Sequence, residues 1–360
     1  MLKTAIHDWH VDHDGRMVDF AGWSMPVQYS TITDEHTAVR TAAGMFDIAH
    51  MGRLRFTGRD ACRFLDYVVT NDVTRLKPGD IRYALVTNQE GGILDDVLVY
   101  RFDACYMLVV NASNREKILD WLKQHSARFE VDIEDQTLSQ FMLAIQGPQA
   151  IDILAELTDV DLASMKYYTG QAATINGVTG IVSRTGYTGE DGFEAIVPVE
   201  SAAEFWQALI AKGQPHGLKP AGLGCRDTLR LEAAMPLYGH EMNESTDPFT
   251  AGLSFGVKLK AGDFIGRDAL MKTRERDDLK VRVGLELVGR RIAREDVAVY
   301  WGKQLAGHVT SGTFSPTLQK SIAMAYVDKS CSDVGTELNV NIRGKEHPAK
   351  IVALPFYSRK

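Results

Sequence analysis

Two adjacent carboxylates, Asp95 and Asp96, follow the pair Gly91-Gly92 and open an apolar run that reaches Arg101. The glycines permit a tight turn, and the β-branched, aliphatic and aromatic residues that follow predict a strand. Successive side chains of a strand point to opposite faces. We therefore expect that the two acids do not work together as an acid/base pair and that only one of them serves a given pocket.

Asp96 shares its predicted strand face with Leu98 and Tyr100. A carboxylate beside an aliphatic and an aromatic side chain is typical of a small-molecule site, which makes Asp96 the candidate of the two. The alternative interpretation is that both acids only end a strand at the protein surface. This segment by itself leaves both interpretations open.

A third carboxylate, Glu194, lies within the apolar run 193–197, directly after the loop 183–192, which is rich in glycine and threonine. A carboxylate buried without a partner costs several kcal/mol, so Glu194 needs either a nearby arginine or a ligand with donors of its own. The loop lacks the lysine of a Walker motif and the spacing of a dinucleotide fingerprint. Its glycines therefore do not indicate phosphate binding.

Residues 222–234 predict a helix that carries Arg226 and Arg230 one turn apart and ends before Pro236. One arginine can pair with a neighbouring acid, Asp227 or Glu232. The other is then free to bind a carboxylate or the polar edge of a ring, for which guanidinium geometry is suited.

His7, His10 and His13 recur at every third residue, which raises the possibility of a metal site. No cysteine or well-spaced set of carboxylates completes such a site, so we favour a polar, partly exposed helix and no metal. The chain has four cysteines, at 62, 105, 225 and 331, which are far apart and form no CxxC pair. They are typical of reduced thiols in an intracellular protein.

Composition excludes several classes of protein. The chain has 360 residues, 45% of them hydrophobic, a net charge of -7 and a pI near 5.8, which together argue against general nucleic-acid binding. No stretch approaches the roughly 20 apolar residues that span a bilayer. The first residues resemble neither a secretion signal nor a transit peptide, so we expect a cytoplasmic protein.

The pattern of elements predicts an α+β protein with a separate all-β module. Residues 34–43 predict a helix, 44–56 one strand, and Asp60 the cap of a helix that starts at Ala61. A compact unit is expected from strands near 54, 83–86, 94–101 and 106–111 with helices at 61–69 and 114–125. Pro148 is expected to start a further helix, and 272–282 a solvated linker or helix face before the β module that begins near Val281.

With these residues in view, the chain resembles the aminomethyltransferase (T-protein) family of the glycine cleavage system. The resemblance runs from end to end and is carried by the segments MVDFAGWSMPVQY, FDIAHMGRLRFTG, TNDVTRLKPGD, YALVTNQEGGILDDVLVYR, SRTGYTGEDGFEAIVP, GCRDTLRLEAAMPLYGHEM and VTSGTFSPTLQKSIAMAYV. The family implies a three-domain α+β fold around a tetrahydrofolate site, with antiparallel sheets and a C-terminal β-barrel. The implied domains are residues 1–50 plus 138–250, an inserted unit at 51–137, and a linker and barrel at 251–360.

The resemblance also assigns residues. It implies that Asp96 is catalytic and lies beside N10 of the folate, that Glu194 accepts hydrogen bonds from N3 and the 2-amino group of the pterin, and that Arg226 binds folate. The remaining residues expected to line the pocket are Tyr83, Tyr187, Met51, Tyr100 and Asn111. A C-terminal aromatic that approaches the folate corresponds to Phe356 or Tyr357, and we take Tyr357 as the candidate.

The implied substrate is an aminomethyl group on the lipoyl arm of H-protein. Its carbon passes to tetrahydrofolate with release of ammonia, giving 5,10-methylenetetrahydrofolate, and the family needs no metal or nicotinamide. N10 is a weak nucleophile because it is an arylamine. A fixed carboxylate that orients it, takes up its proton and faces developing positive charge can contribute roughly 10²–10⁴-fold to the rate.

Two other readings belong to the same fold. One is a tetrahydrofolate-dependent demethylase, which tends to differ around the position of Asp96. The other is a non-enzymatic folate-binding protein of iron–sulfur maintenance, whose Lys-Gly-Cys motif is absent from 235–241. The chain departs from the family pattern at 249–255, where an acid and a tryptophan are common and Thr250 and Phe255 stand here, and at Asp296, where a glycine is usual.

Overall fold

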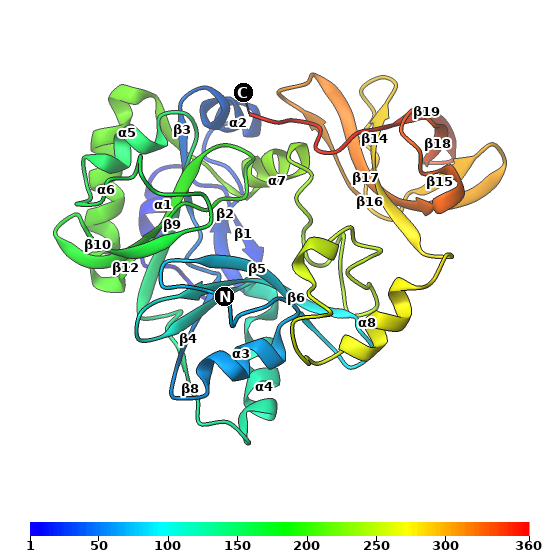
Figure 1. Ribbon diagram of the computed structural model, residues 1–360. Coiled ribbons are helices and arrows are strands. Elements are labelled where there is room, and N and C mark those ends of the chain that lie inside the picture. Colours follow the sequence, from blue (N-terminus) through cyan, green and yellow to red (C-terminus); the bar gives the residue numbers. More distant parts are fainter. Residues whose placement is uncertain (360) are drawn as a thin grey trace.

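The computed structural model describes residues 1–359. Its strands form a six-stranded sheet, a five-stranded sheet, a closed six-stranded barrel and a short two-stranded ribbon. The two sheets and the barrel are arranged as three units around a common centre (Figure 1). The α+β class with antiparallel sheets and a C-terminal barrel is therefore confirmed, whereas the exact limits of the three predicted domains stay a prediction.

The six-stranded sheet combines strands from distant parts of the sequence. In spatial order it consists of β10 (Gly170–Ile175), β11 (Val178–Ser183), β12 (Gly192–Pro198), β9 (Gln140–Gln146), β3 (Ala43–Asp47) and β13 (Leu218–Pro220). The associated helices and ribbon strands are α1 (His7–Asp12), β1 (Met17–Phe20), β2 (Trp23–Pro26), α2 (Ile32–Thr41), α5 (Ala150–Ala155), α6 (Ala202–Gly213) and α7 (Leu223–Glu232). Phe193, Ala195 and Val197 of β12 point into one core with Trp206 of α6. The alternate residues Glu194 and Ile196 consequently belong to the opposite face.

The five-stranded sheet consists of β5 (Ile81–Thr87), β6 (Ile93–Arg101), β7 (Tyr106–Val110), β4 (Gly52–Thr57) and β8 (Asp132–Asp135). One face packs against α3 (Ala61–Val68) and α4 (Arg115–Ser126) through Val97 and Val99 of β6. The other face carries Leu98 and Tyr100, which pack with Met142 and Ile196 of the six-stranded sheet and Leu229 of α7. The faces of β6 and β12 that bear Asp96 and Glu194 therefore both turn toward the layer between the sheets.

The turn before β6 requires both of its glycines. Gly91 has φ +86°, and a Cβ on Gly92 would lie 1.8 Å from the carbonyl oxygen of Glu244. Any larger residue at 92 would push away the segment 243–246, which is hydrogen-bonded to Ile93 through the carbonyl oxygens of Asn243 and Thr246. The predicted tight turn is confirmed, and it fixes the start of the strand that carries Asp96.

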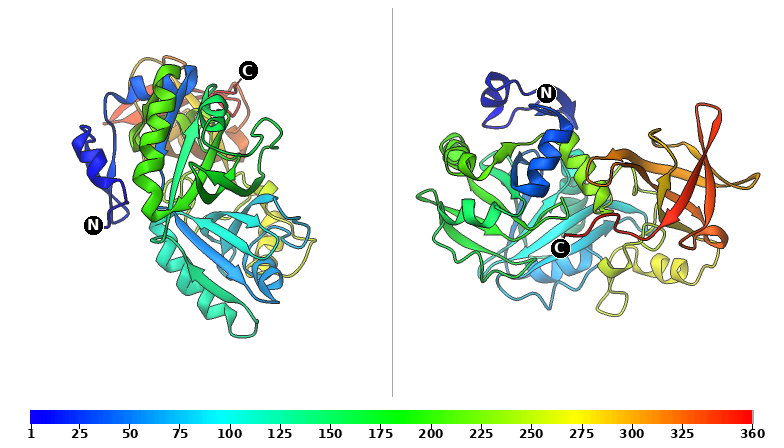
Figure 2. Two further views of the ribbon diagram at one scale, coloured as in Figure 1. Left: turned by 90° about the vertical axis from the view of Figure 1, so that its left-hand side faces the viewer. Right: turned by 90° about the horizontal axis from the view of Figure 1, so that it is seen from above.

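The barrel closes in the order β14 (Lys280–Leu287), β17 (Lys320–Asp328), β16 (Gln304–Ser315), β15 (Ala298–Trp301), β18 (Glu337–Ile342) and β19 (Lys345–Val352). Helix α8 (Arg267–Arg274) precedes it and lies beside the β5–β6 turn, where a Cβ on Gly91 would touch Leu270. After β19 the chain returns from the barrel to the unit of the six-stranded sheet (Figure 2), where the Tyr357 amide donates to the carbonyl of Glu232 at 2.8 Å.

Several local predictions are wrong. Residues 44–56 form two strands in different sheets instead of one, because the chain turns at 48–51, where the Asp47 carboxylate accepts from the Ala49 amide. Helix α3 begins at Ala61 with Asp60 at its N-cap position, as predicted, but the Asp60 side chain accepts from the Glu130 amide and makes no capping hydrogen bond. Helix α5 begins at Ala150 and not at Pro148, and α7 ends at Glu232 because Ala234 has φ +54°.

Asp296 occupies a left-handed backbone conformation with φ +64°, and its amide donates to the carbonyl of Val309. Glycine is the default residue in this conformation, and aspartate is among the few others that adopt it regularly. The departure from the family pattern at this position is therefore compatible with the same turn.

Candidate active site

The Asp96 carboxylate is held by one donor from each strand that flanks β6. The Tyr83 hydroxyl donates to Asp96 Oδ2 at 3.1 Å, and Asn111 Nδ2, just beyond β7, donates to Asp96 Oδ1 at 2.7 Å. Burial raises the pKa of Asp96, while these two hydrogen bonds favour its charged form. The arrangement gives a fixed carboxylate that holds a proton more readily than an ordinary aspartate.

Asp95 points to the opposite face, as expected, but it is not independent of Asp96. It has no exposed surface and accepts three hydrogen bonds, from the Asn111 amide at 3.0 Å, Asn111 Nδ2 at 2.8 Å and Asn114 Nδ2 at 2.6 Å. The side-chain Nδ2 of Asn111 thus donates to both carboxylates. Burial and the neighbouring charge of Asp96 raise the pKa of Asp95. The two carboxylates are therefore linked through Asn111, and the alternative in which both acids end a strand at the surface is wrong.

We expect Asp95→Asn to lower the free energy of unfolding by about 1–3 kcal/mol, because an amide NH₂ would face donors that Asp95 now satisfies. The rate should also fall, since Asn111 would no longer be held in place beside Asp96. Urea unfolding of the purified variant measures the first effect. A variant as stable and as active as the parent would show that the Asp95–Asn111 contacts contribute neither to stability nor to the rate.

Glu194 is 6% exposed and accepts a hydrogen bond from Thr185 Oγ1 at 2.6 Å. Burial raises the pKa of Glu194. Within residues 1–359 its carboxylate forms no direct ion pair, so the alternative of an arginine in contact with it is wrong, although the charge of Arg226 favours the ionised form. Tyr100 lies nearby, with its hydroxyl 3.3 Å from Ser183 Oγ. Thr185 was not singled out from the sequence, because both threonines of the loop are buried and nothing in the pattern indicates which of them donates to Glu194.

The two arginines of α7 have different surroundings. Arg230 forms ion pairs with Asp227 at 2.8 Å and with Glu241 at 2.9 Å, and it donates to Ser311 of the barrel at 2.8 Å. Arg226 forms no ion pair within the part of the chain that the structure describes. Its guanidinium lies over the Tyr187 ring at 4.8 Å, and its Nη1 atom is buried with no hydrogen-bond partner. Burial lowers the pKa of Arg226. The prediction of one paired and one free arginine is confirmed.

The other candidate residues divide into two groups. Tyr187 lies at the site beneath Arg226, its hydroxyl donating to the Pro236 carbonyl, and Met51 packs against the cluster between the two sheets. The Tyr357 ring lies 4.0 Å from the Arg40 guanidinium, and its hydroxyl donates to Glu190 at 2.7 Å. Phe356 packs against Leu231 and Met324. The structure thus brings neither C-terminal aromatic into contact with Asp96.

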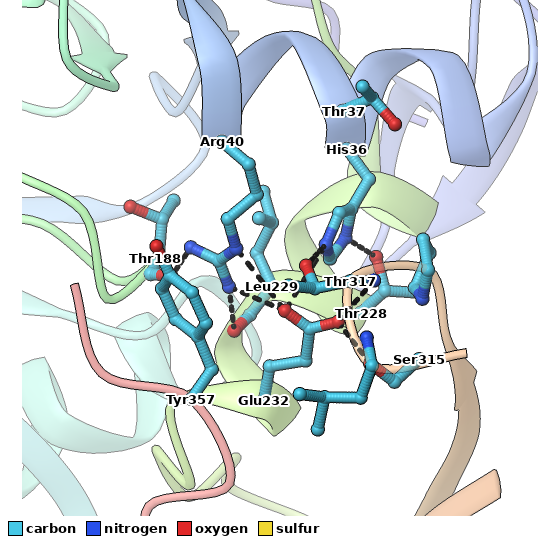
Figure 3. A network of polar contacts seen from close by, with 12 residues as sticks. His36, Thr37, Arg40, Thr188, Thr228, Leu229, Glu232, Ser315, Thr317 and Tyr357 are labelled. Atoms are coloured by element: carbon cyan, nitrogen blue, oxygen red, sulfur yellow. Dashed lines mark hydrogen bonds and ion pairs between the residues drawn. The ribbon is translucent and has the colours of Figure 1, made fainter. Parts of the chain in front are cut away.

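Tyr357 belongs to a polar network that sequence reasoning missed (Figure 3). At its centre, the Glu232 carboxylate of α7 pairs with Arg40 at 2.8 Å and with His36 at 3.2 Å, and it also accepts from Ser315 at the end of β16. Although burial opposes it, bonding to His36 helps lower the pKa of Glu232 to about 2. The network ties α2, α7, the barrel and the C-terminal segment together behind the helix that presents Arg226.

The three N-terminal histidines do not converge on one point. His10 is fully buried and binds Asp47 at 2.9 Å and the Tyr29 hydroxyl at 2.8 Å, whereas His7 contacts Ser24 and His13 the Trp9 carbonyl. Among residues 1–359 no group of three or more His, Cys, Asp or Glu side chains has the geometry of a metal site. In the same range, no helix has the length and apolar character that crossing a membrane demands.

Known proteins are similar to this chain over its whole length. The model of the GCVT N-terminal domain matches residues 6–261, and the model of the glycine cleavage T-protein C-terminal barrel domain matches residues 280–358. The aminomethyltransferase of Streptomyces coelicolor is 48% identical over 366 residues, covering 100% of this chain and 98% of the relative. That of Caldanaerobacter subterraneus subsp. tengcongensis is 45% identical over 361 residues, covering 100% and 96%.

The solved structure of glycine cleavage system aminomethyltransferase T from Bartonella henselae has a TM-score of 0.93 to this chain, with 31% identity and coverage of 99% and 98%. Fold, site and relatives together define a one-carbon group transferase, and the chain belongs to the glycine cleavage T-protein family. Its activity is that of an aminomethyltransferase of the glycine cleavage system.

Proposed function

We propose that tetrahydrofolate binds in the layer between the two sheets, with its pterin held by Glu194 and Arg226 and its reacting nitrogens beside Asp96. The observation that carries the proposal is the buried Arg226 Nη1 atom without a hydrogen-bond partner, near a Glu194 carboxylate that is 6% exposed and forms no direct ion pair within residues 1–359. Leaving such groups unpaired costs free energy that a ligand with matching donors and acceptors recovers. A pterin has both, at adjacent positions of one ring edge.

Tetrahydrofolate supplies the two nitrogen atoms that accept the one-carbon unit. The chain supplies a carboxylate whose position is fixed by Tyr83 and Asn111. Because burial raises the pKa of Asp96 toward the working pH, its carboxylate is a better proton acceptor than an exposed aspartate. Held in place before the reaction, it also faces developing positive charge without having to reorganise. We propose that Asp96 is the catalytic residue and takes up the proton.

The aromatic side chains Tyr83, Tyr100 and Tyr187 line the proposed pocket together with Met51 and Asn111. The co-substrate is the aminomethyl group on the lipoyl arm of H-protein, which serves as the protein partner, and the reaction takes place in the cytoplasm without a metal. Support for the partner comes from membership of the family, whose models match both parts of the chain.

We expect tetrahydrofolate at about 100 times its dissociation constant to raise the melting temperature, since a ligand that binds only the folded state adds about 2.7 kcal/mol at that concentration. Thermal unfolding with and without folate, each in the presence and absence of a chelator, measures the shift. Identical melting curves would contradict folate binding. A shift that disappears with the chelator would support the alternative hypothesis that the N-terminal histidines bind a metal.

A further inference from the structure

A basic hollow lies outside the proposed folate site, between β5 and the segment that leads into α8. It has a volume of about 470 Å³ and is lined by five cationic residues and one acidic residue, namely Arg75, Arg82, Lys258, Lys260, Arg274 and Asp72. Only Arg75 is paired, with Asp72 at 3.1 Å, and Arg82 donates to the Asp72 carbonyl at 2.8 Å. Lys258, Lys260 and Arg274 are exposed and form no ion pair within residues 1–359. On a chain of net charge -7, such a concentration of unpaired positive charge predicts an acidic partner.

An exposed aromatic side chain lies next to this hollow. Phe255 is 60% exposed and stacks on Tyr83, with 5.3 Å between ring centroids, while its neighbour Ser254 lines the hollow. A large exposed aromatic beside unpaired arginine and lysine side chains is the composition of a protein-binding surface, in which an aromatic anchor is surrounded by a charged rim. A small anion would bind the arginine and lysine side chains but would make no contact that requires an exposed aromatic such as Phe255.

The surface is also connected to the reacting centre. The ring that Phe255 covers belongs to Tyr83, whose hydroxyl donates to Asp96 at 3.1 Å. A protein seated on Phe255 and the basic hollow is therefore separated from the catalytic carboxylate by a single aromatic side chain. A flexible prosthetic arm attached to that protein needs only to pass the Tyr83–Phe255 stack to reach Asp96.

From these observations we propose that Phe255 with Lys258, Lys260 and Arg274 forms the docking surface for the lipoyl carrier protein, through acidic side chains around its lipoyl arm. The proposal rests on the proposed function because it assigns a place on this chain to the partner named there. It adds the position of the contact, its charge, and the route by which the arm enters.

Direct binding of lipoylated H-protein without folate tests the surface separately from folate binding and turnover. We expect Lys260→Glu/Arg274→Glu to weaken the dissociation constant about tenfold or more at low ionic strength, because both residues would then repel acidic side chains. Binding to the parent should weaken as salt is added, and binding to the double variant should depend less on salt. Phe255→Ala should weaken binding by an amount that salt does not change.

Lys303→Glu/Lys345→Glu is the matched control, because it makes the same change of charge at exposed positions on the barrel. It should bind the carrier like the parent, and all variants should melt within a few degrees of the parent. Equal weakening in both double variants, or in neither, would contradict the proposal. If Lys260→Glu/Arg274→Glu lost affinity only for oligo-γ-glutamyl tetrahydrofolate and not for the carrier, the hollow would bind the folate tail, and the docking proposal would be overturned. Failure of the parent to bind folate would overturn the proposed function and leave this result unaffected.

Discussion

Replacing Asp96 by Asn should lower kcat about a hundredfold or more while folate affinity stays within about tenfold of the parent. Asparagine keeps the size of the side chain and can still accept from Asn111 Nδ2 and bond to the Tyr83 hydroxyl, so the ground-state contacts largely persist. It cannot take up a proton or face positive charge with a full negative charge. A group that acts chiefly in the transition state appears in kcat and not in binding. Steady-state turnover at saturating folate, together with a folate titration, measures both quantities.

The same substitution should not cost stability at neutral pH. Because burial raises the pKa of Asp96, the folded state binds its proton more tightly than the unfolded chain does, and this contribution to stability is lost as the pH rises through the folded-state pKa. The free energy of unfolding of Asp96→Asn relative to the parent should therefore increase between pH 5 and pH 8. A variant with near-parental turnover, or one inactive because it fails to fold, would contradict the role assigned to Asp96.

The second large expected effect is on folate binding, and it distinguishes Arg226 from Arg230 on α7. Arg226→Ala should weaken folate binding about 10–100-fold, as expected for the loss of a charged hydrogen bond, and should leave stability unchanged or improved. Its Nη1 atom is buried without a hydrogen-bond partner, so removing the side chain removes a cost to the folded state. Glu194→Gln should behave in the same way, because burial also raises the pKa of Glu194. Folate titration of each variant measures the dissociation constant, and urea unfolding measures the free energy of unfolding.

Arg230→Ala is the matched control, one helical turn away. Although burial opposes it, Glu241 raises the pKa of Arg230, and loss of the arginine leaves the Glu241 carboxylate buried without its cation. We expect a loss of about 3–5 kcal/mol in stability and little effect on folate binding by the fraction that remains folded. If Arg226→Ala instead lost stability and bound folate like the parent, Arg226 would have a structural role only.

Local patterns in the sequence predicted the elements that carry the site. The run after Gly91-Gly92 predicted β6, and the spacing on α7 predicted one paired and one free arginine, because both patterns depend on residues within one turn or one strand. The contacts of Asp95 were not predictable in this way. Its partners Asn111 and Asn114 lie 16 and 19 positions further along, and only the pairing of β6 with β7 brings them close.

The position of Tyr357 depends on contacts between residues that are still further apart in the sequence. The resemblance implies a C-terminal aromatic at the folate, which stays a prediction, and the structure shows Tyr357 in contact with Arg40 and Glu190. Those residues come from α2 and from the loop before β12, and the C-terminal segment reaches them only because it returns from the barrel to Glu232. No pattern within 353–359 contains that information. The family resemblance, which spans the whole chain, supplied the function that the local patterns left open.

Release of ammonia by the purified protein tests the account most directly. With lipoylated H-protein that carries the aminomethyl group, we expect ammonia and 5,10-methylenetetrahydrofolate to form in equal amounts, with the rate dependent on tetrahydrofolate and insensitive to a chelator. Asp96→Asn in the same assay should release ammonia about a hundredfold more slowly. Release that is equally fast without tetrahydrofolate, or equally fast in the Asp96→Asn variant, would contradict the proposal that this carboxylate and a bound folate carry out the transfer.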